Sequence, residues 1–168
     1  MDEDLRVGII GVGVMGADHA ERIVWRIAGA RLVAVSDADA ARTALVTRQF
    51  AGVRAFADPL ALIADDGVDA VLIASPGFAH EEQVLACLEQ RKPTLCEKPL
   101  TMDAASSLRL VEAECAAGPP LVQVGFMRRF DPEYVRMKSL LDSGSLGRTL
   151  LLHNIHRNRS VPSAAFRS

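Results

Sequence analysis

Short apolar runs alternate along the chain with longer amphipathic segments. The apolar runs are rich in Val, Leu and Ile, as in strands buried on both faces of a parallel sheet, and they lie at 5–10, 31–36, 53–56, 68–74, just before Glu97 and at 121–125. Apolar positions at helical spacing or capping signals indicate helices at 15–28, 38–50, 61–64, 80–91, 101–115 and from 132 onward. This βαβαβαβαβαβ order predicts an α/β fold, a doubly wound Rossmann sheet of six parallel strands.

Polar and glycine residues mark the expected helix ends. Asp58-Pro59 and Asp131-Pro132 each place an N-cap residue before a proline at the first helical position. We expect Gly29 to stop the helix at 15–28, and Thr101 to cap the helix that runs through Cys115. The last apolar segment, 149–158, reads as one long strand with no later strand to pair with it.

Composition narrows the class of protein. The 168 residues are 49% hydrophobic and 24% charged, with a net charge of −2, so no nucleic-acid partner is expected. The acidic start lacks the features of a signal peptide, and no apolar run reaches the length of a membrane span. The cysteines, Cys87, Cys96 and Cys115, form no C-x-x-C pair, which argues against a zinc site or a disulfide framework. We expect a cytoplasmic protein, with Cys87 and Cys115 buried in helices and Trp25 in the core or an interface.

The first strand runs into a glycine-rich loop, 11–16. Its sequence is Gly11-Val12-Gly13-Val14-Met15-Gly16, a G-x-G-x-x-G spacing at a strand-to-helix junction. In a dinucleotide site, the first glycine allows the tight turn, the second lets the backbone approach a pyrophosphate, and the third lets helix and strand pack closely. The helix that follows points free N–H groups at the phosphates. A flexible turn is the alternative reading of the same pattern.

An acidic residue stands where a dinucleotide site needs one. Asp37 ends the second strand, 21 residues after Gly16 (37 − 16), which matches the acid that binds the adenosine ribose. A carboxylate there accepts hydrogen bonds from the diol and repels a 2′-phosphate, so it favours NAD over NADP. The alternative role for Asp37 is a helix N-cap. Arg42 lies one turn further on and could meet a phosphate, so NADP stays open as the less favoured cofactor.

Two later loops carry further candidate residues. Ser75-Pro76 ends a buried strand beside the expected cofactor crevice, and His80 follows as either a cofactor-loop contact or an ordinary first-turn helix residue. Glu97-Lys98-Pro99 ends the next strand, and the proline holds Lys98 out of the helical region. Lysine can accept or donate a proton in catalysis, although a surface salt bridge with Glu97 is the default reading.

Taken together, these motifs make the chain similar to the Gfo/Idh/MocA family of nicotinamide-dependent oxidoreductases. The residues that carry the resemblance are Gly11 to Gly16, Asp37, Ser75-Pro76 with His80, and Cys96-Glu97-Lys98-Pro99-Leu100. The stretches 124–132 and 153–158 resemble the inositol 2-dehydrogenase branch. The resemblance reaches to about Asn158, and it implies two domains here, a nucleotide-binding one at 1–126 and, at 127–168, a linker helix with the first strand of a second α/β domain.

The resemblance also implies roles for these residues. It implies hydride transfer from a polyol or sugar carbon to NAD, with Lys98 as the catalytic residue that holds the reacting hydroxyl. The cofactor would be bound by Gly11, Val12, Gly13, Val14, Met15, Gly16, Asp37, Ser75, Pro76, His80 and Glu97. The substrate would lie near Lys98, Met127, Arg128 and Asn158. No metal is implied, and family members form homo-oligomers.

The family pattern also predicts what this chain lacks. After His-Arg-Asn the family continues with Pro-Thr, whereas this chain reads Asn158-Arg159-Ser160-Val161-Pro162. In the family, a second domain carries an Asp and a His that complete the catalytic set with the lysine. The sequence therefore predicts a truncated chain, in which oligomer formation is doubtful. The alternatives are a non-catalytic dinucleotide-binding module, or a relative that acts on another sugar with NADP.

Overall fold

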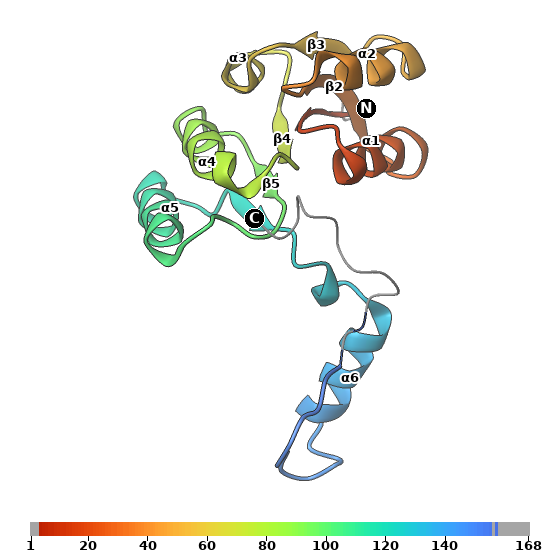
Figure 1. Ribbon diagram of the computed structural model, residues 1–168. Helices are drawn as coiled ribbons and strands as arrows, with labels where there is room; N and C mark the ends of the chain where they lie inside the picture. Colours follow the sequence, from red (N-terminus) through yellow and green to blue (C-terminus); the bar gives the residue numbers. More distant parts are fainter. Residues whose placement is uncertain (1–3, 156, 158–168) are drawn as a thin grey trace. The chain divides into compact units, whose positions relative to one another are not determined.

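The computed structural model describes residues 4–155 and 157 (Figure 1). The chain divides into two units, Met1–Phe126 and Met127–Ser168. The first holds all the strands of the described chain, and its sheet runs β3-β2-β1-β4-β5-β6 with every neighbouring pair parallel. The strands are β1 (Leu5–Ile10), β2 (Ala30–Ser36), β3 (Arg54–Phe56), β4 (Ala70–Ile73), β5 (Thr94–Cys96) and β6 (Val122–Val124). The doubly wound six-stranded prediction is confirmed, and the strand order reverses between β1 and β4.

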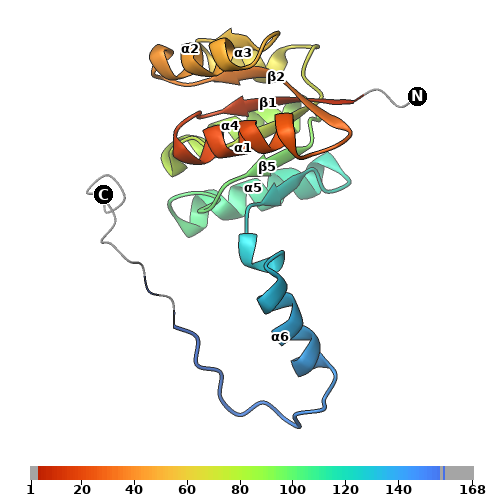
Figure 2. The same cartoon turned by 90° about the vertical axis from the view of Figure 1, so that its right-hand side faces the viewer.

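Helices cover both faces of this sheet. They are α1 (Val14–Trp25), α2 (Ala40–Gln49), α3 (Pro59–Ala64), α4 (His80–Glu89) and α5 (Ala104–Ala117). Figure 1 shows α1 and α2 on one side and α3, α4 and α5 on the other, and Figure 2 shows the same layers after a quarter turn. Each face has its own buried core: Ile9 and Leu72 belong to the α1/α2 side, and Ile73 and Val84 to the α3–α5 side. Because the strands bury both faces, their sequences read as continuous apolar runs.

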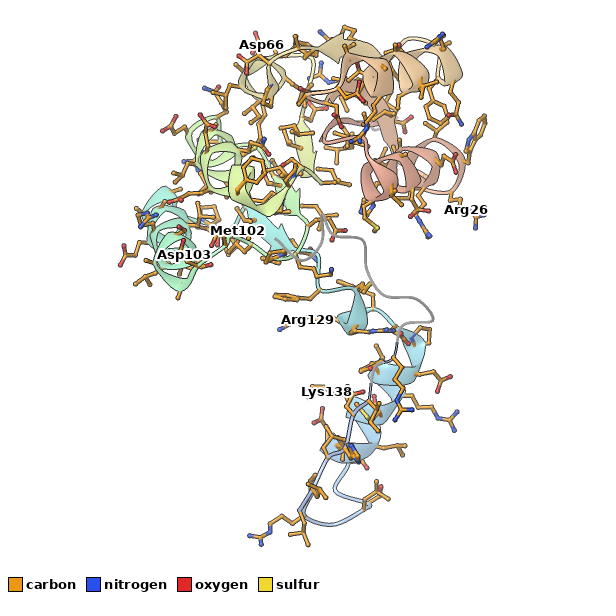
Figure 3. All side chains as sticks on the ribbon, in the orientation of Figure 1. Arg26, Asp66, Met102, Asp103, Arg129 and Lys138 are labelled. Carbon is orange, nitrogen blue, oxygen red and sulfur yellow. The ribbon has the colours of Figure 1, made fainter. Side chains whose placement is uncertain are left out.

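Aspartates cap most of the helices. Asp58 accepts a hydrogen bond from the backbone N–H of Leu60, as predicted. The expected Thr101 cap is wrong, because Asp103 accepts from the Ser106 N–H at 2.8 Å and α5 begins at Ala104. Thr101 instead donates its hydroxyl to the Asp103 backbone carbonyl. A charged acceptor two residues later is the stronger cap, and Figure 3 labels Asp103 at the start of α5.

Three further expectations in the first unit need correction. Helix α1 ends at Trp25 rather than reaching Gly29, because the next residues, such as half-exposed Ile27, offer no apolar face to the core. Trp25 is 71% exposed and stacks edge-on against Phe50, with ring centroids 6.2 Å apart, so it is not a core residue. Cys115 is exposed, because it lies on the outer face of α5, whereas Cys87 is buried as expected.

The second unit contains a short 3-10 turn, η2 (Met127–Arg129), and one helix, α6 (Pro132–Asp142). Asp131 caps α6 by accepting from the Glu133 N–H, as predicted. Near its end, Lys138 pairs with Asp142 one turn later (Figure 3). The expected strand is wrong for 149–155, which forms no strand, because no described strand pairs with it. Within residues 4–155 and 157, no helix has the length and apolar character needed to cross a membrane.

Candidate functional site

The glycine loop connects the end of β1 to the start of α1 and packs against Ala74 and Ser75, which follow β4. Gly11 has φ +83° and donates its N–H to the Ser36 carbonyl at 2.7 Å. A Cβ on Gly11 would lie 2.5 Å from the Ser75 nitrogen, and a Cβ on Gly16 would lie 1.8 Å from the Gly11 oxygen. Only glycine allows the positive φ at the first position and such close packing of helix and strand at the last. The loop therefore lies at the reversal of strand order, where doubly wound sheets bind ligands.

The second glycine faces space that protein atoms leave free. A Cβ on Gly13 would meet only the Arg42 Nη1, at 3.5 Å. Gly13 is also the N-cap of α1 and supplies no side-chain cap, so the first N–H groups of the helix remain available to an anion. Val12 is buried, whereas Val14 is 90% exposed and Met15 is about half exposed. Val12 thus anchors the loop, while Val14 and Met15 stand at its surface.

Asp37 lies against the same loop. Its Oδ2 accepts the Val12 N–H at 2.8 Å, its Oδ1 accepts the Asp39 N–H at 2.9 Å, and its side chain is 8% exposed. The alternative role as a helix N-cap is wrong, because Asp39 caps α2 by accepting from the Ala41 N–H. Each carboxylate oxygen keeps a free lone pair after one backbone bond. The carboxylate can therefore accept two more hydrogen bonds at the rim of the loop, as a ribose diol would offer.

His80 connects the loops after β4 and β5. Its ring is 1% exposed, with Nδ1 2.9 Å from the Pro99 carbonyl oxygen and Nε2 2.8 Å from the Ser75 carbonyl oxygen. Ser75 also donates its hydroxyl to Gln83 at 2.6 Å, whereas Pro76 is exposed. Carbonyls only accept, so the ring donates to at least one of them. In this arrangement His80 positions the two loops, and Pro76 lies at the surface of the first.

Replacing His80 by phenylalanine should lower the free energy of unfolding by about 1–3 kcal/mol for each ring N–H that now donates to a carbonyl. The change keeps a ring but leaves at least one of the two carbonyls, those of Ser75 and Pro99, without its buried donor, at about 1–3 kcal/mol for each donor lost. Urea denaturation followed by circular dichroism measures the effect. His80→Gln keeps an N–H donor and should recover part of the loss. An unchanged midpoint for His80→Phe would show that the two contacts contribute nothing.

Glu97 has a partner that the sequence did not indicate. Its Oε1 lies 2.9 Å from His19 Nε2 on α1, and its Oε2 accepts the Lys98 N–H at 3.3 Å. A Cβ on Gly125 would lie 3.2 Å from the Glu97 carboxylate, so the backbone just after β6 approaches the same group. The default salt bridge between Glu97 and Lys98 is wrong, because Glu97 pairs with His19 instead. The only signal for His19 was its position, one helical turn after Gly16.

Lys98 follows on this loop with an exposed side chain. Its ammonium has no hydrogen bond or ion pair to any residue of the described chain, and its peptide bond to Pro99 is cis. Cys96, just before the loop, is no competing nucleophile, because burial raises the pKa of its thiol to about 12. Lys98 is thus the group on this loop that is free to meet a substrate.

The remaining candidate residues lie in the second unit. Met127 and Arg128 are exposed in η2, where Arg128 donates to Asp131 at 2.6 Å and lies over the Tyr134 ring. Asn158 lies outside the described residues. These three stay predictions as substrate contacts.

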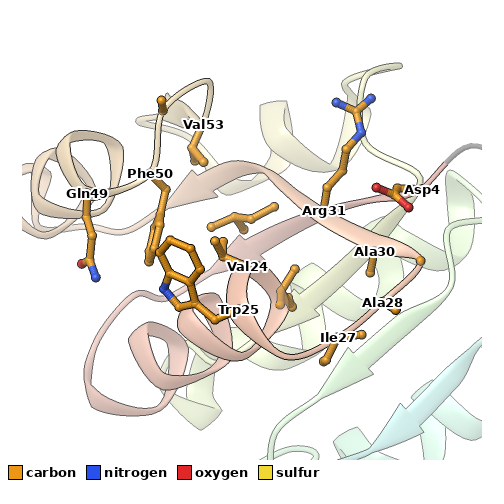
Figure 4. Close-up of a pocket in the computed structure, with 14 residues that line it drawn as sticks. Asp4, Val24, Trp25, Ile27, Ala28, Ala30, Arg31, Gln49, Phe50 and Val53 are labelled. Atoms are coloured by element: carbon orange, nitrogen blue, oxygen red, sulfur yellow. The ribbon is translucent and has the colours of Figure 1, made fainter.

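A separate cavity of about 570 Å³ lies at the other end of the sheet (Figure 4). Trp25 and Phe50 line it together with the start of β2, and the polar groups at its edge come from Asp4, Arg31 and Gln49. The amino ends of β1 and β2 border this cavity, whereas the glycine loop follows the carboxyl end of β1. It is therefore distinct from the candidate site.

Comparison with known proteins agrees with this geometry. Residues 5–126 match the GFO_IDH_MocA family model, described as an oxidoreductase family with an NAD-binding Rossmann fold. The inositol 2-dehydrogenase of Mycolicibacterium gilvum is 56% identical over 160 residues, which cover 95% of this chain and 46% of that protein. Its counterpart in Rhodococcus erythropolis is 55% identical over 162 residues, covering 96% and 47%. The chain spans about half the length of the curated relatives it matches.

Solved structures show the same likeness. The myo-inositol dehydrogenase of Lactobacillus casei, in complex with NAD(H) and myo-inositol, superposes with a TM-score of 0.83 at 36% identity, covering 86% of this chain and 43% of that one. The scyllo-inositol dehydrogenase of the same organism, with bound NAD(H) and scyllo-inositol, gives a TM-score of 0.82 at 30% identity, covering the same fractions.

Proposed function

Because the chain belongs to the Gfo/Idh/MocA oxidoreductase family, we propose that it binds NAD and serves the oxidation of a secondary alcohol of an inositol. The observation that carries this proposal is the space above Gly13, next to free helix N–H groups and the Asp37 carboxylate. An inositol is the substrate class because the relatives compared above are inositol dehydrogenases.

The residues present fit a nicotinamide dinucleotide. The backbone of Gly11 to Gly16 would hold the pyrophosphate, and Asp37 would accept the hydroxyls of the adenosine ribose. The loops that carry Ser75, Pro76 and Glu97 would border the nicotinamide, with His80 holding those loops in place. When bound, the nicotinamide accepts the hydride that leaves the alcohol carbon.

Lys98 would accept the proton that the alcohol releases. Oxidation of a secondary alcohol to a ketone releases one hydride and one proton, so a group beside the hydroxyl must take that proton. Lys98 is exposed and unpaired within the described chain, on the loop that His80 and His19 hold in place. We therefore assign Lys98 to hold the reacting hydroxyl and, as the neutral amine, to accept its proton. The resemblance further implies that Met127, Arg128 and Asn158 would lie near the substrate.

Two measurements test the proposal. Titration with NADH should saturate, as followed by calorimetry. Myo-inositol together with NAD should then produce NADH, as followed by its absorbance, with no product when either is omitted. Failure to bind NADH would contradict the proposal at its first step. The cytoplasmic location expected from the sequence remains a prediction that these measurements do not address. The same holds for the homo-oligomer, which the resemblance implies for the family and which the sequence analysis makes doubtful for this chain.

A second candidate is a non-catalytic dinucleotide-binding module. The observation that favours it is that every cofactor contact we assign lies within the first unit. NADH binding without inositol-dependent turnover would support this candidate. A preference for NADPH would instead favour a relative that acts on another sugar.

A further inference from the structure

The Glu97 carboxylate is held at the carboxyl end of the sheet by groups from three segments. His19 on α1 has its Nε2 2.9 Å from Oε1, the Lys98 N–H donates to Oε2 at 3.3 Å, and the backbone at Gly125 lies close by. The side chains of His19 and Glu97 are 20% and 16% exposed. Because a carboxylate only accepts hydrogen bonds, Nε2 carries the proton that it donates to Glu97. The negative charge of Glu97 is therefore fixed in place and largely withdrawn from solvent.

By the strand order, this charge lies on the nicotinamide side of the proposed dinucleotide site. β2 ends just before Asp37, which we assign to the adenosine ribose, and β1 ends at the glycine loop. From β1 the sheet continues in the other direction, to β4 and then β5. A dinucleotide that crosses the reversal of strand order would therefore extend its other half over the ends of β4 and β5. Glu97 comes directly after β5.

Charge distinguishes the two forms of the cofactor. The nicotinamide ring of NAD⁺ carries one positive charge, the ring of NADH is neutral, and the rest of the two molecules is the same. A carboxylate near the ring therefore attracts the oxidised form alone, and the attraction grows where water is excluded. Lys98 adds a positive charge on the same loop. Its ammonium forms no ion pair with Glu97, whose carboxylate contacts His19 and the Lys98 backbone instead.

We propose that the His19–Glu97 pair selects the oxidised cofactor. Glu97 supplies a negative charge beside the nicotinamide, and His19 is a positioning residue that holds the carboxylate there. This inference rests on the proposed function, since it assumes that a dinucleotide binds at the glycine loop. Selection of NAD⁺ suits the oxidation of an alcohol, because the oxidised cofactor must enter the site and the reduced one must leave it. A tenfold change in the ratio of the two dissociation constants corresponds to about 30 mV in the potential of the bound two-electron couple.

Binding of both cofactor forms tests the role of Glu97. The dissociation constants of NAD⁺ and NADH are measured by calorimetry at about pH 8, where a free imidazole is neutral. In Glu97→Gln the affinity for NAD⁺ relative to NADH should fall about three- to tenfold, because one unit charge near the ring is lost. Glutamine keeps the length of the side chain and an oxygen that accepts hydrogen bonds. The ratio of the two constants cancels any loss of binding that affects both forms equally.

A double-mutant cycle tests the positioning role of His19. His19→Leu removes the donor, so the carboxylate can turn toward water, and the ratio should shift in the same direction as in Glu97→Gln, by about twofold or more. Added to Glu97→Gln, His19→Leu should change the ratio no further, because it acts through the charge of Glu97. His19→Gln keeps an N–H donor and should restore most of the wild-type ratio.

Controls separate the outcomes. Glu112→Gln removes an exposed carboxylate of α5, on the other face of the sheet from α1 (Figure 1), and should leave the ratio unchanged. Glu97→Asp withdraws the charge by one methylene and should give a smaller shift, in case Glu97→Gln does not fold; thermal melting checks every variant. An unchanged ratio in Glu97→Gln would overturn the selection and leave the proposed function intact, and an unchanged ratio in His19→Leu would overturn the positioning role. A wild type that binds neither form would overturn the proposed function itself.

Discussion

Replacing Lys98 by methionine should lower the rate of inositol oxidation by about 10²- to 10⁴-fold, the usual contribution of a positioned acid or base. Methionine keeps an unbranched apolar stem and removes the amino group, which makes no hydrogen bond or ion pair with a described residue. The fold should therefore be unaffected. The dissociation constant of NADH should stay within about twofold, because the cofactor contacts that we assign lie on other residues.

The measurement is NADH formation at saturating NAD over a range of myo-inositol concentrations. Lys138→Met is the matched control, because it removes another exposed lysine, whose partner within the described chain is Asp142 on its own helix. The control should retain the wild-type rate. A Lys98→Met variant with unchanged turnover would contradict the assignment of Lys98 as the proton acceptor. It would leave dinucleotide binding and inositol oxidation by the wild type unaffected as claims.

The sheet could be predicted from the sequence because its strands are buried on both faces. Such strands, β4 for example, leave a continuous apolar run that local reasoning recognises. The helix ends were less predictable, because Thr101 and Asp103 are both good caps and only the geometry of the turn selects one. The strand expected at 149–158 failed over 149–155 for a different reason: a strand needs a partner, and apolar character alone does not supply one.

The candidate site likewise has residues that could be predicted from the sequence and contacts that could not. The glycine loop and Asp37 are contiguous with strand ends, so spacing along the chain located them. His80 and Glu97 depend on contacts between distant segments: His80 meets Pro99, 19 residues on, and Glu97 meets His19, 78 residues earlier. No local pattern indicates such pairs. The sequence therefore located these two side chains but did not indicate that His80 connects the loops after β4 and β5, or that Glu97 connects the second of these loops to α1.

Replacing Gly16 by alanine should lower the free energy of unfolding by about 3 kcal/mol or more and abolish NADH binding. The added Cβ would lie 1.8 Å from the Gly11 carbonyl oxygen and 2.9 Å from its carbon. Both are backbone atoms, so α1 itself must move away from β1, which costs more than ordinary overpacking of flexible side chains. Alanine gains only about 1 kcal/mol over glycine in a helix interior. The clash outweighs this gain, so the substitution lowers the free energy of unfolding.

Gly13→Ala is the matched comparison, and it should separate stability from binding. Its Cβ would meet only the end of the flexible Arg42 side chain, and Gly13 has an extended backbone (φ −69°, ψ −157°) that alanine also adopts. Its unfolding free energy should stay within about 1 kcal/mol of the wild type. NADH affinity should nevertheless fall at least tenfold, because the methyl group would occupy the space that we assign to the pyrophosphate. Denaturant unfolding and calorimetry on both variants measure the two effects, and undiminished NADH affinity in Gly13→Ala would place the dinucleotide elsewhere.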